Sequence, residues 1–503
     1  MSTSFSGTRA PTFILALDQG TTSSRALLFD RDGRICRTAQ EELTQHYPQP
    51  GWVEHDPDEI WASQLNVAQQ VLREHGVHAR DIAAIGIANQ RETTLLWDRR
   101  TGIPIAPAIV WQDRRTADDC EALRTAGHSE LVRRATGLEI DAYFSASKIR
   151  WLLQHVPQAH ALAESGHLAF GTVDSWLAYK LCGRHVTDHS NASRTMLFNI
   201  HTMTWDDEML ALFDIPRSLL PELVCSSGVI GTTHEELFGL PVMLAALAGD
   251  QQAAAFGQVC CRPGMVKNTY GTGCFMLLNT GETAIESQHR LLSTASCTLA
   301  PEALPTYFLE GSVFMAGAIV QWLRDGLRII RHSGDVEKLA ASVGESDGTV
   351  LVPAFVGLGA PYWDSYARAA ILGMSRSTTD GHIALAALES IAFQTADMIE
   401  AMQKDAGMQI AELRVDGGAS RNDLLMQCQA DMLGIEVTRP LITETTALGA
   451  AQLAGIACGF WESVEEISSK WQIDHIFEPR ITSDARREKL ERWHRAVQHV
   501  RQW

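Results

Sequence analysis

The sequence predicts an α/β protein with two similar domains that face each other across a cleft. Three aliphatic strands each end in an acidic residue beside glycine, at Asp18, Asp250 and Asp416. Strand-like and helical stretches alternate in both halves, and 503 residues suffice for two large domains. Ligands of open α/β sheets bind beyond the carboxyl ends of strands, where these acids lie. We expect the boundary near Gly257, which gives domains at residues 1–256 and 257–503.

Strand signals dominate the beginning of the first half. Apolar runs at residues 12–18, 25–30 and 82–88 have the length of strands, and residues 93–110 read as a hairpin. Residues 116–215 are mainly helical in pattern. The first half therefore predicts a sheet that is followed by a helical segment.

One helix of the first half has a readable start. Asp56 stands where an N-cap is needed, Pro57 occupies the first helical position and Glu59 the third. This arrangement is typical of a capped helix N-terminus. We expect a helix from this point to about His75, ended by a glycine.

The second half repeats the theme. Residues 264–279 predict a strand, a turn and a second strand, and residues 412–415 predict a strand that ends at an acid. Residues 313–330 and 383–405 have the apolar spacing of amphipathic helices. The order of elements thus favours a second α/β domain.

Composition excludes several classes of protein. The net charge is −18, which argues against binding to nucleic acid or to anionic membranes, because those partners need a basic surface. No apolar run approaches the roughly 20 residues that span a bilayer. The ten cysteines include no C-x-x-C pair, which argues against a zinc site or a disulfide framework. We expect a cytoplasmic protein.

Three turns of small residues follow strands and could bind phosphate. They are Asp18–Ser23, Tyr270–Gly273 and Asp416–Ser420. Such turns present backbone amides and hydroxyls to phosphate oxygens, and a leading acid can hold Mg²⁺ through its waters. Each turn alone could equally be a plain hairpin turn. Together they favour a divided nucleotide site, and the absence of any Gly-Lys pair excludes a P-loop.

Two strand ends carry candidates for chemistry on a polyol. Asp250 could be a general base that accepts a hydroxyl proton, a helix N-cap, or both. Arg91 and Glu92 supply the donors and acceptors that a polyol needs, although an exposed ion pair is the better explanation of this segment taken alone. Trp111 and Phe275 could wall a pocket against a carbon skeleton, or could be core residues.

Collinear segments from about residue 12 to about residue 460 carry a specific resemblance. They are residues 17–25, 89–94, 110–116, 143–148, 249–254, 267–275, 311–317, 357–363 and 415–418. Together they resemble the glycerol kinases, within the large sugar-kinase family that has the actin-type ATPase fold. The Gln-Arg-Glu-Thr strand end at residues 90–93 separates this group from other sugar kinases.

The resemblance implies two actin-like (ribonuclease-H-like) domains with a catalytic cleft between them. It also implies ATP-dependent phosphorylation of glycerol to sn-glycerol 3-phosphate, in glycerol uptake and catabolism, with Mg²⁺ and with closure of the domains over the substrates. The N-terminal domain would hold glycerol and the phosphates, and the C-terminal domain the rest of the nucleotide. A homo-oligomer, either a dimer or a tetramer, is the expected assembly, without nucleic acid or membrane insertion.

The resemblance also assigns residues by position. Asp250 would be the base, and the residues around glycerol would be Arg91, Glu92, Tyr143, Asp250, Gln251, Trp111 and Phe275. The residues around ATP would be Thr21, Thr22, Ser23, Arg25, Thr272, Gly317, Gln321, Gly418 and Asn422. Asp18 and Asp250 would lie near Mg²⁺.

Two other functions remain open at this point. A kinase for another small polyol or a ketose has the same fold, and fold alone does not identify a substrate. The group Arg91, Glu92 and Trp111 favours glycerol, because it indicates a short pocket. An actin-like nucleotide switch or scaffold is the non-enzymatic alternative, and Asp250 at a strand end counts against it.

Overall fold

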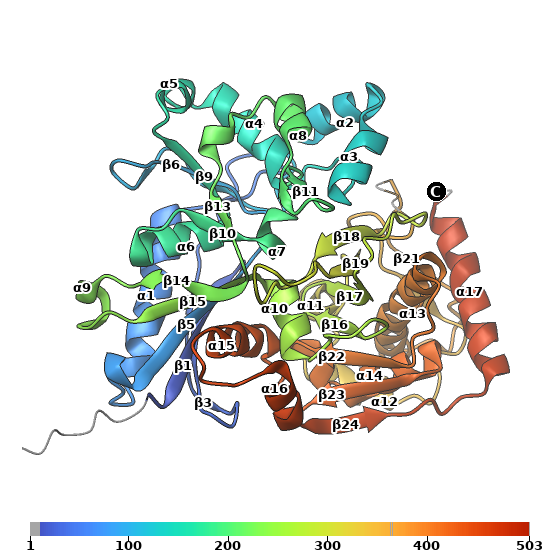
Figure 1. The fold of residues 1–503 in the computed structure, drawn as a ribbon. Helices are drawn as coiled ribbons and strands as arrows, with labels where there is room; N and C mark the ends of the chain where they lie inside the picture. Colours follow the sequence, from blue (N-terminus) through green and yellow to red (C-terminus); the bar gives the residue numbers. More distant parts are fainter. Residues whose placement is uncertain (1–10, 363, 365, 502–503) are drawn as a thin grey trace, which may run out of the picture. The chain divides into compact units, whose positions relative to one another are not determined.

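The computed structural model describes residues 11–362, 364 and 366–501 (Figure 1). Residues 1–10 and 502–503, the outer ends of the predicted domains, lie outside the described residues, as does Trp363 in one segment of the resemblance. The chain forms two compact units. Within the described residues, unit 1 comprises 11–259, 294–307 and 446–470, and unit 2 comprises 260–293, 308–445 and 471–501.

The first change between units falls between Val259 and Cys260, close to Gly257. Two later segments, residues 294–307 and 446–470, return to unit 1, which a single boundary does not describe. The division into residues 1–256 and 257–503 stays a prediction. The α/β character of both units confirms the predicted fold class.

Unit 1 is built on a six-stranded sheet in the order β14-β15-β5-β1-β2-β3. Its three central strands are parallel, and the outer pairs β1–β2, β2–β3 and β14–β15 are antiparallel. The strands are β1 (Phe13–Gln19), β2 (Ser23–Phe29), β3 (Ile35–Glu42), β5 (Ile82–Asn89), β14 (Ser227–Thr232) and β15 (Met243–Gly249).

Short strands and helices complete unit 1. The short strands are β4 (Glu54–His55), β6 (Leu95–Asp98), β7 (Ile103–Pro104), β8 (Ala108–Ile109), β9 (Leu168–Gly171), β10 (Val186–Asp188), β11 (Phe198–Asn199), β12 (Thr204–Trp205) and β13 (Glu222–Val224). The helices are α1 (Pro57–Arg73), α2 (Ala117–Thr125), α3 (Ser129–Thr136), α4 (Ser145–His155), α5 (Ala159–Glu164), α6 (Val173–Cys182), α7 (His189–Ala192), α8 (Asp207–Phe213), α9 (Glu235–Phe238), α10 (Asp250–Gly257), α15 (Thr445–Ala457) and α16 (Val464–Lys470). The predicted hairpin of residues 93–110 is confirmed by the antiparallel pair β6–β7.

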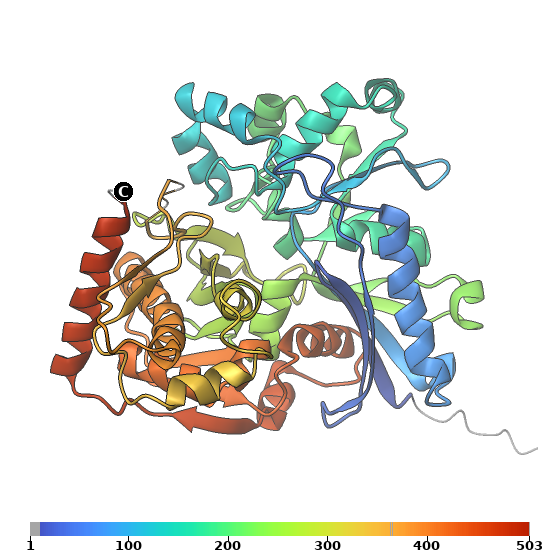
Figure 2. The same ribbon diagram turned by 180° about the vertical axis from the view of Figure 1, so that it is seen from behind.

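Helix α1 follows its predicted cap. The Asp56 side chain accepts a hydrogen bond from the Asp58 amide, and Pro57 is the first helical residue. Glu59 does not reach back to the cap, because its carboxylate accepts from the Thr44 amide at 2.9 Å. Helix α1 packs against β2 and β3, and the view from behind shows it beside these strands (Figure 2).

Unit 2 is built on a seven-stranded sheet in the order β18-β19-β17-β16-β22-β23-β24. Strand β16 pairs antiparallel with β17 and parallel with β22, and β22 pairs parallel with β23. The same pattern occurs in unit 1, where β1 pairs antiparallel with β2 and parallel with β5, and β5 pairs parallel with β15. The strands are β16 (Val266–Tyr270), β17 (Cys274–Gly281), β18 (Leu292–Ala295), β19 (Tyr307–Val313), β22 (Glu412–Asp416), β23 (Glu436–Pro440) and β24 (Ile473–Phe477). This shared order confirms that the second half repeats the first.

The remaining elements of unit 2 are mostly helices. They are α11 (Gly317–Asp325), α12 (Asp335–Ala341), α13 (Asp380–Ala406), α14 (Asp423–Leu433) and α17 (Ser483–Arg501), with the strand pair β20 (Val350–Val352) and β21 (Ala370–Leu372). The predicted helix at residues 383–405 is confirmed by α13. The predicted helix at residues 313–330 is too long, because Val313 ends strand β19 and α11 spans only nine residues. An apolar strand followed directly by an apolar helix had produced one continuous pattern.

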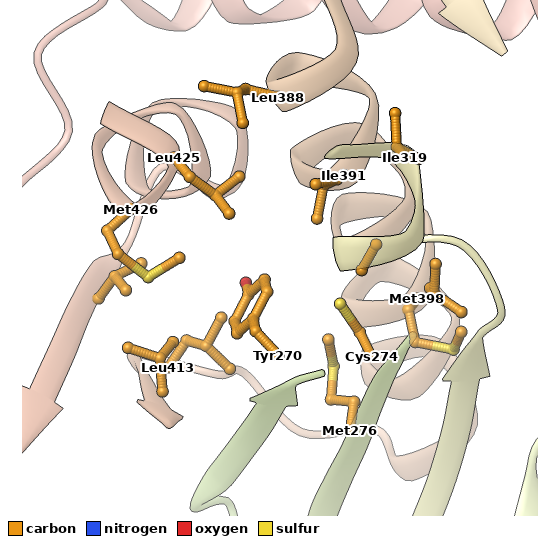
Figure 3. Packing of buried hydrophobic residues seen from close by; sticks show 14 of the residues in the cluster. Tyr270, Cys274, Met276, Ile319, Leu388, Ile391, Met398, Leu413, Leu425 and Met426 are labelled. Carbon is orange, nitrogen blue, oxygen red and sulfur yellow. The ribbon is translucent and has the colours of Figure 1, made fainter. Parts of the chain in front are cut away.

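Each unit has its own apolar core. In unit 1, Leu15 and Leu17 of β1 pack with Ile85 and Ile87 of β5 and with Val67 of α1. In unit 2, apolar residues of β16 and β22 pack against α13 and α14. Tyr270, at the end of β16, lies among Leu413, Leu425 and Met426 (Figure 3). The Tyr270 hydroxyl donates to Gln429 at 2.7 Å, so its polar atom is satisfied inside the core.

Candidate functional site

The three central strands of unit 1 end at the same level. Gln19 of β1 pairs with Asn89 of β5, and Asn89 pairs with Gly249 of β15. Because parallel strands present their carboxyl ends at one edge of the sheet, the residues that follow them lie close together. The sheet therefore places Asp18, Arg91 and Asp250 at or just beyond the carboxyl ends of these three strands.

Asp250 is at once a helix residue and a candidate base. Helix α10 begins at Asp250, with Gly249 in the N-cap position, and Asp250 Oδ1 accepts from the Gln251 amide at 2.8 Å. The Arg91 Nε lies 3.4 Å from the same oxygen, and the Asp250 side chain is 30% exposed. The carboxylate is thus fixed on one side and reaches solvent on the other.

Gly249 makes room for the Arg91 side chain. A Cβ at position 249 would lie 2.7 Å from Arg91 Cδ and 2.9 Å from Gln252 Oε1. Arg91 Nη1 also donates to Gln252 Oε1 at 3.2 Å, which fixes the far end of the guanidinium. Glycine at this strand end thus lets the arginine lie beside Asp250.

Arg91 and Glu92 are buried, so the interpretation of this pair as an exposed ion pair is wrong. Their side chains are each 2% exposed, and Arg91 Nε lies 3.8 Å from Glu92 Oε1. Glu92 has a φ of 60°, which a non-glycine residue rarely adopts. Its carboxylate accepts a shorter bond, 2.6 Å, from Nε of Arg194. A buried acceptor and a buried donor therefore stand side by side at this strand end.

Aromatic side chains stand beside the phosphate turn. The Trp111 indole Nε1 donates to Thr21 Oγ1 at 2.8 Å, and its ring meets the Tyr143 ring edge-on at a centroid distance of 5.5 Å. Both rings are half-buried, so neither is a core residue. Trp111 and Tyr143 together offer an apolar wall in unit 1, whereas Phe275 lies on β17 in unit 2 and its contact with substrate stays a prediction.

The turn between β1 and β2 presents three hydroxyl residues in a row. Its backbone closes through the Gly20 amide and the Ser23 carbonyl at 3.0 Å. Thr22 is exposed, and Thr21 and Ser23 are half-buried. Arg25, on β2, pairs with Asp18 on β1 at 2.7 Å. The turn thus combines hydroxyl donors with a cation and can hold phosphate oxygens.

The polar residues Gln90, Gln45 and His55 support this turn, and only Gln90 lies in a segment that the sequence analysis singled out. Gln90 Nε2 donates to the Gln19 side chain and to the Gly20 carbonyl, each at 3.1 Å. Gln45 donates to the Thr21 carbonyl at 2.9 Å and also bonds to His55 at 2.9 Å. Burial lowers the pKa of His55 to about 4, so the imidazole is neutral at pH 7.

Lys148 fixes the backbone that carries Tyr143. Its ammonium donates to the carbonyls of Ala142, Tyr143 and Phe144, at 2.6, 2.6 and 3.1 Å. Burial lowers the pKa of Lys148 to about 8, although the negative charge of Glu92 acts in the opposite direction. A buried lysine carries no distinctive spacing, so only the resemblance marked this residue, as the end of one matching segment.

Glycines bring three turns of unit 2 into close approach. A Cβ at Gly317 would lie 2.6 Å from the Gly271 carbonyl oxygen, and one at Gly417 would lie 2.5 Å from the Tyr270 carbonyl oxygen. The Ala316 amide donates to the Thr272 carbonyl at 2.9 Å. Gly417 also has a φ of 82°. The turn after β16, the start of α11 and the end of β22 therefore meet with bare backbone between them.

The other predicted nucleotide residues of unit 2 surround these turns. Gln321 is an exposed residue of α11, and Gly418 is exposed after β22. Asn422 caps α14, because its Oδ1 accepts from the Leu425 amide at 2.8 Å. The structure brings Thr272 and Gly317 together, and the roles of Gln321, Gly418 and Asn422 toward nucleotide stay predictions.

Comparison with known families decides the class of protein. Residues 13–257 match the N-terminal domain of the FGGY family of carbohydrate kinases, and residues 266–458 match the C-terminal domain of that family.

The chain belongs to the FGGY family of carbohydrate kinases.

Named relatives within this family of carbohydrate kinases cover nearly the whole chain. Glycerol kinase of Janthinobacterium sp. (strain Marseille) is 63% identical over 98% of this chain and 99% of its own length. Glycerol kinase of Herminiimonas arsenicoxydans is 64% identical with the same coverage. The crystal structure of Plasmodium falciparum glycerol kinase with ADP has a TM-score of 0.91 and 34% identity, and covers 97% of this chain and 98% of that chain.

The described part of this carbohydrate kinase holds neither a cluster of potential metal ligands nor a membrane-spanning helix. Among residues 11–362, 364 and 366–501, no group of three or more His, Cys, Asp or Glu side chains is placed to hold a metal ion. In the same part of the chain, no helix is both long and apolar enough to cross a bilayer.

Replacement of Lys148 by methionine tests the support of Tyr143. Below about pH 8, Lys148 is protonated in both the folded and the unfolded protein. Between about pH 8 and 10.5, the lysine is still protonated in the unfolded chain but has lost its proton in the folded chain. Stability of the wild type therefore rises with pH in this window, relative to Lys148→Met. Thermal unfolding of both proteins from pH 7 to 10.5 measures the difference, and kinetics should show a raised KM for the sugar or polyol substrate.

Lys338→Met, at an exposed lysine of α12, is the control and should leave both readings unchanged. Parallel stability curves for wild type and Lys148→Met would show that Lys148 titrates as an ordinary surface lysine.

Proposed function

We propose that this carbohydrate kinase transfers the γ-phosphoryl group of ATP to glycerol and forms sn-glycerol 3-phosphate and ADP. The observation that carries the proposal is the buried pair Arg91 and Glu92 beside the partly exposed carboxylate of Asp250. Relatives that are 63–64% identical over 98% of the chain are glycerol kinases, which supports the same substrate. The reaction would serve glycerol uptake and catabolism.

The residues of unit 1 suit a short polyol. Arg91 can donate to one hydroxyl and Glu92 can accept from another, while Asp250 and Gln251 follow at the end of the neighbouring strand. Trp111 and Tyr143 would lie against the carbon chain. Buried charged partners are specific for hydroxyls, because an analogue that lacks one leaves them unpaired.

The chemistry asks little covalent work of the protein. A glycerol hydroxyl oxygen attacks the γ-phosphorus of ATP, and the hydroxyl proton passes to Asp250. The bond between the γ-phosphorus and the oxygen that bridges the β- and γ-phosphates breaks, and its electron pair leaves with ADP. The residues contribute position and charge, which carry most of the catalysis of phosphoryl transfer. Asp250 is suited to the base role because its carboxylate is fixed by Arg91 and by the Gln251 amide yet reaches solvent.

The residues predicted to bind the nucleotide occur in both units. Thr21, Thr22, Ser23 and Arg25 would bind the transferred and β-phosphates. The remaining contacts would come from residues of unit 2, namely Thr272, Gly317, Gln321, Gly418 and Asn422. The ADP-bound structure of the Plasmodium falciparum glycerol kinase supports an adenine nucleotide as the donor.

Asp18 and Asp250 fit a Mg²⁺ ion that arrives with the nucleotide. Mg²⁺ takes one or two carboxylates and keeps several waters, so a cluster of three protein ligands is not required. The partly exposed carboxylate of Asp250 suits such a site, and Asp18, paired with Arg25, would act through water. The ion would neutralise charge on the phosphates. A cytoplasmic location and a homo-oligomer of two or four chains stay predictions.

A substrate panel tests the proposed function. Purified full-length protein would be assayed for ADP release with ATP and with glycerol, dihydroxyacetone, xylulose or gluconate, each alone. We expect the highest kcat/KM for glycerol, because Arg91, Glu92 and the rings of Trp111 and Tyr143 suit a three-carbon polyol. A higher kcat/KM for xylulose or gluconate would overturn the proposal.

Asp250→Asn tests the proposed base. The amide retains an oxygen for the Gln251 N–H, so the start of α10 should persist. We expect turnover at saturating substrates to fall by about 10²- to 10⁴-fold, the usual contribution of a positioned base, while glycerol and ATP affinities change little. Rapid-quench turnover and calorimetric binding measure the two quantities.

Asp206→Asn is the matched control, because Asp206 also lies at the start of a helix of unit 1, α8, and its carboxylate accepts hydrogen bonds from backbone amides of that helix. Its turnover should equal that of the wild type. Near wild-type turnover of Asp250→Asn would show that Asp250 only begins a helix and that the base lies elsewhere.

Glu92→Gln tests the carboxylate as an acceptor for a glycerol hydroxyl. A hydrogen bond to a charged group contributes about 1.5–3 kcal/mol, so glycerol kcat/KM should fall by roughly 10- to 150-fold. The KM for ATP should change little. The variant should use substrates that lack the bound hydroxyl relatively better, which kcat/KM for glycerol, 1,2-propanediol and 1,3-propanediol would reveal.

Glu389→Gln is the control, because Glu389 is a buried glutamate in unit 2 that forms an ion pair with the half-buried Lys489. It should leave the diol ratios unchanged. Unchanged ratios for both diols in Glu92→Gln would mean that the carboxylate does not bind a substrate hydroxyl.

A further inference from the structure

Arg194 is a buried cation next to the proposed glycerol site. It follows the short helix α7, and its side chain is 0% exposed. Its Nε donates to Glu92 Oε1 at 2.6 Å. The guanidinium carbon lies 5.4 Å from the centroid of the Tyr143 ring and 5.1 Å from that of Phe144. Arg194 thus touches two residues that the proposal assigns to glycerol, Glu92 and Tyr143.

A buried arginine is costly unless its charge is compensated. An unpaired guanidinium in a protein interior has lost its hydration, so such groups are found with a carboxylate or an aromatic face. Here the partners are the Glu92 carboxylate and the two rings. The same interaction compensates the buried negative charge of Glu92.

Glu92 also needs to be held in place, because its backbone conformation is strained. A φ of 60° at a non-glycine residue persists only where the surroundings impose it. The Glu92 carbonyl accepts from Thr94 Oγ1 and from Ser145 Oγ, each at 3.0 Å, so the backbone is fixed on one side. Arg194 fixes the side chain.

Helix α7 ties Arg194 to the same strand ends. The Arg194 amide donates to the Asn191 carbonyl at 3.0 Å. The Asn191 side chain exchanges two 3.0 Å hydrogen bonds with Asn89 at the end of β5. Ser190 Oγ accepts from the Gly249 amide at 2.9 Å at the end of β15. One short segment therefore sets Asn89, Glu92 and Gly249 relative to one another.

We propose that Arg194 is a positioning residue for substrate recognition: it holds the Glu92 carboxylate in the place in which it accepts a hydrogen bond from a substrate hydroxyl. Arg194 acts through Glu92. This inference rests on the proposed function of the site, because the substrate hydroxyl in question is one of glycerol.

A double-mutant cycle tests the inference. The proteins are the full-length wild type, Glu92→Gln, Arg194→Met and the double variant, assayed with glycerol and with the two propanediols. We expect Arg194→Met to lower glycerol kcat/KM by roughly 10- to 150-fold and to shift the diol ratios in the same direction as Glu92→Gln. The KM for ATP should change little.

The cycle separates an action through Glu92 from general structural damage. If Arg194 acts through Glu92, adding Arg194→Met to Glu92→Gln should cost no more than about 3-fold, because the contact is already weakened. Losses that multiply, or diol ratios that stay at wild-type values in Arg194→Met, would overturn the inference. Lys489→Met, which breaks the ion pair with Glu389 in unit 2, is the control and should leave the diol ratios unchanged.

Two outcomes need a second comparison. Arg194→Met alone leaves the Glu92 charge buried without its closest cation, which could prevent folding. The double variant replaces both charges, so its kcat/KM relative to that of Glu92→Gln still shows whether Arg194 acts through Glu92. If the wild type prefers another panel substrate to glycerol, the proposed function fails, and the same cycle on the preferred substrate then decides the role of Arg194. A wild type that is active on glycerol with independent losses in the cycle overturns the inference alone.

Discussion

The parallel register of β1, β5 and β15 is the constraint on which the site of unit 1 depends. Gln19, Asn89 and Gly249 lie level across these strands, so the residues that follow them emerge together at one edge. Arg91 and Asp250, which are far apart in the sequence, thereby come into contact, and Asp18 lies near the end of the adjacent strand β1. A slip of one residue in either pairing would turn these side chains to the opposite face of the sheet.

Close backbone approach is the second constraint, and it explains where glycine occurs. Gly249 lets Arg91 lie against the end of β15, and Gly317 and Gly417 let three turns of unit 2 meet. A Cβ at any of these positions would lie within 2.7 Å of another atom. Charge compensation is also local in unit 1, because three cations interact with the Glu92 carboxylate, namely Arg91, Arg194 and Lys148.

Much of the fold and part of the site could be predicted from the sequence, because local patterns determine them. Asp56 and Pro57 mark the start of α1, and the apolar runs before Asp18, Asp250 and Asp416 predict strands that end at these acids or one residue away from them. The contact between Glu92 and Arg194 could not be predicted, because it joins residues that are 102 positions apart. The length of α11 was missed for a local reason, since a strand and a helix in succession share one apolar pattern.

A crystal structure of the full chain grown with glycerol, without nucleotide, tests the central claim most directly. We expect glycerol at the carboxyl ends of β1, β5 and β15, with its hydroxyls within hydrogen-bond distance of Arg91, Glu92 and Asp250. Its carbon chain should lie against Trp111 and Tyr143. Glycerol that binds elsewhere in the chain, or that meets Asp250 without Arg91 and Glu92, would contradict the claim that these strand ends form the substrate site.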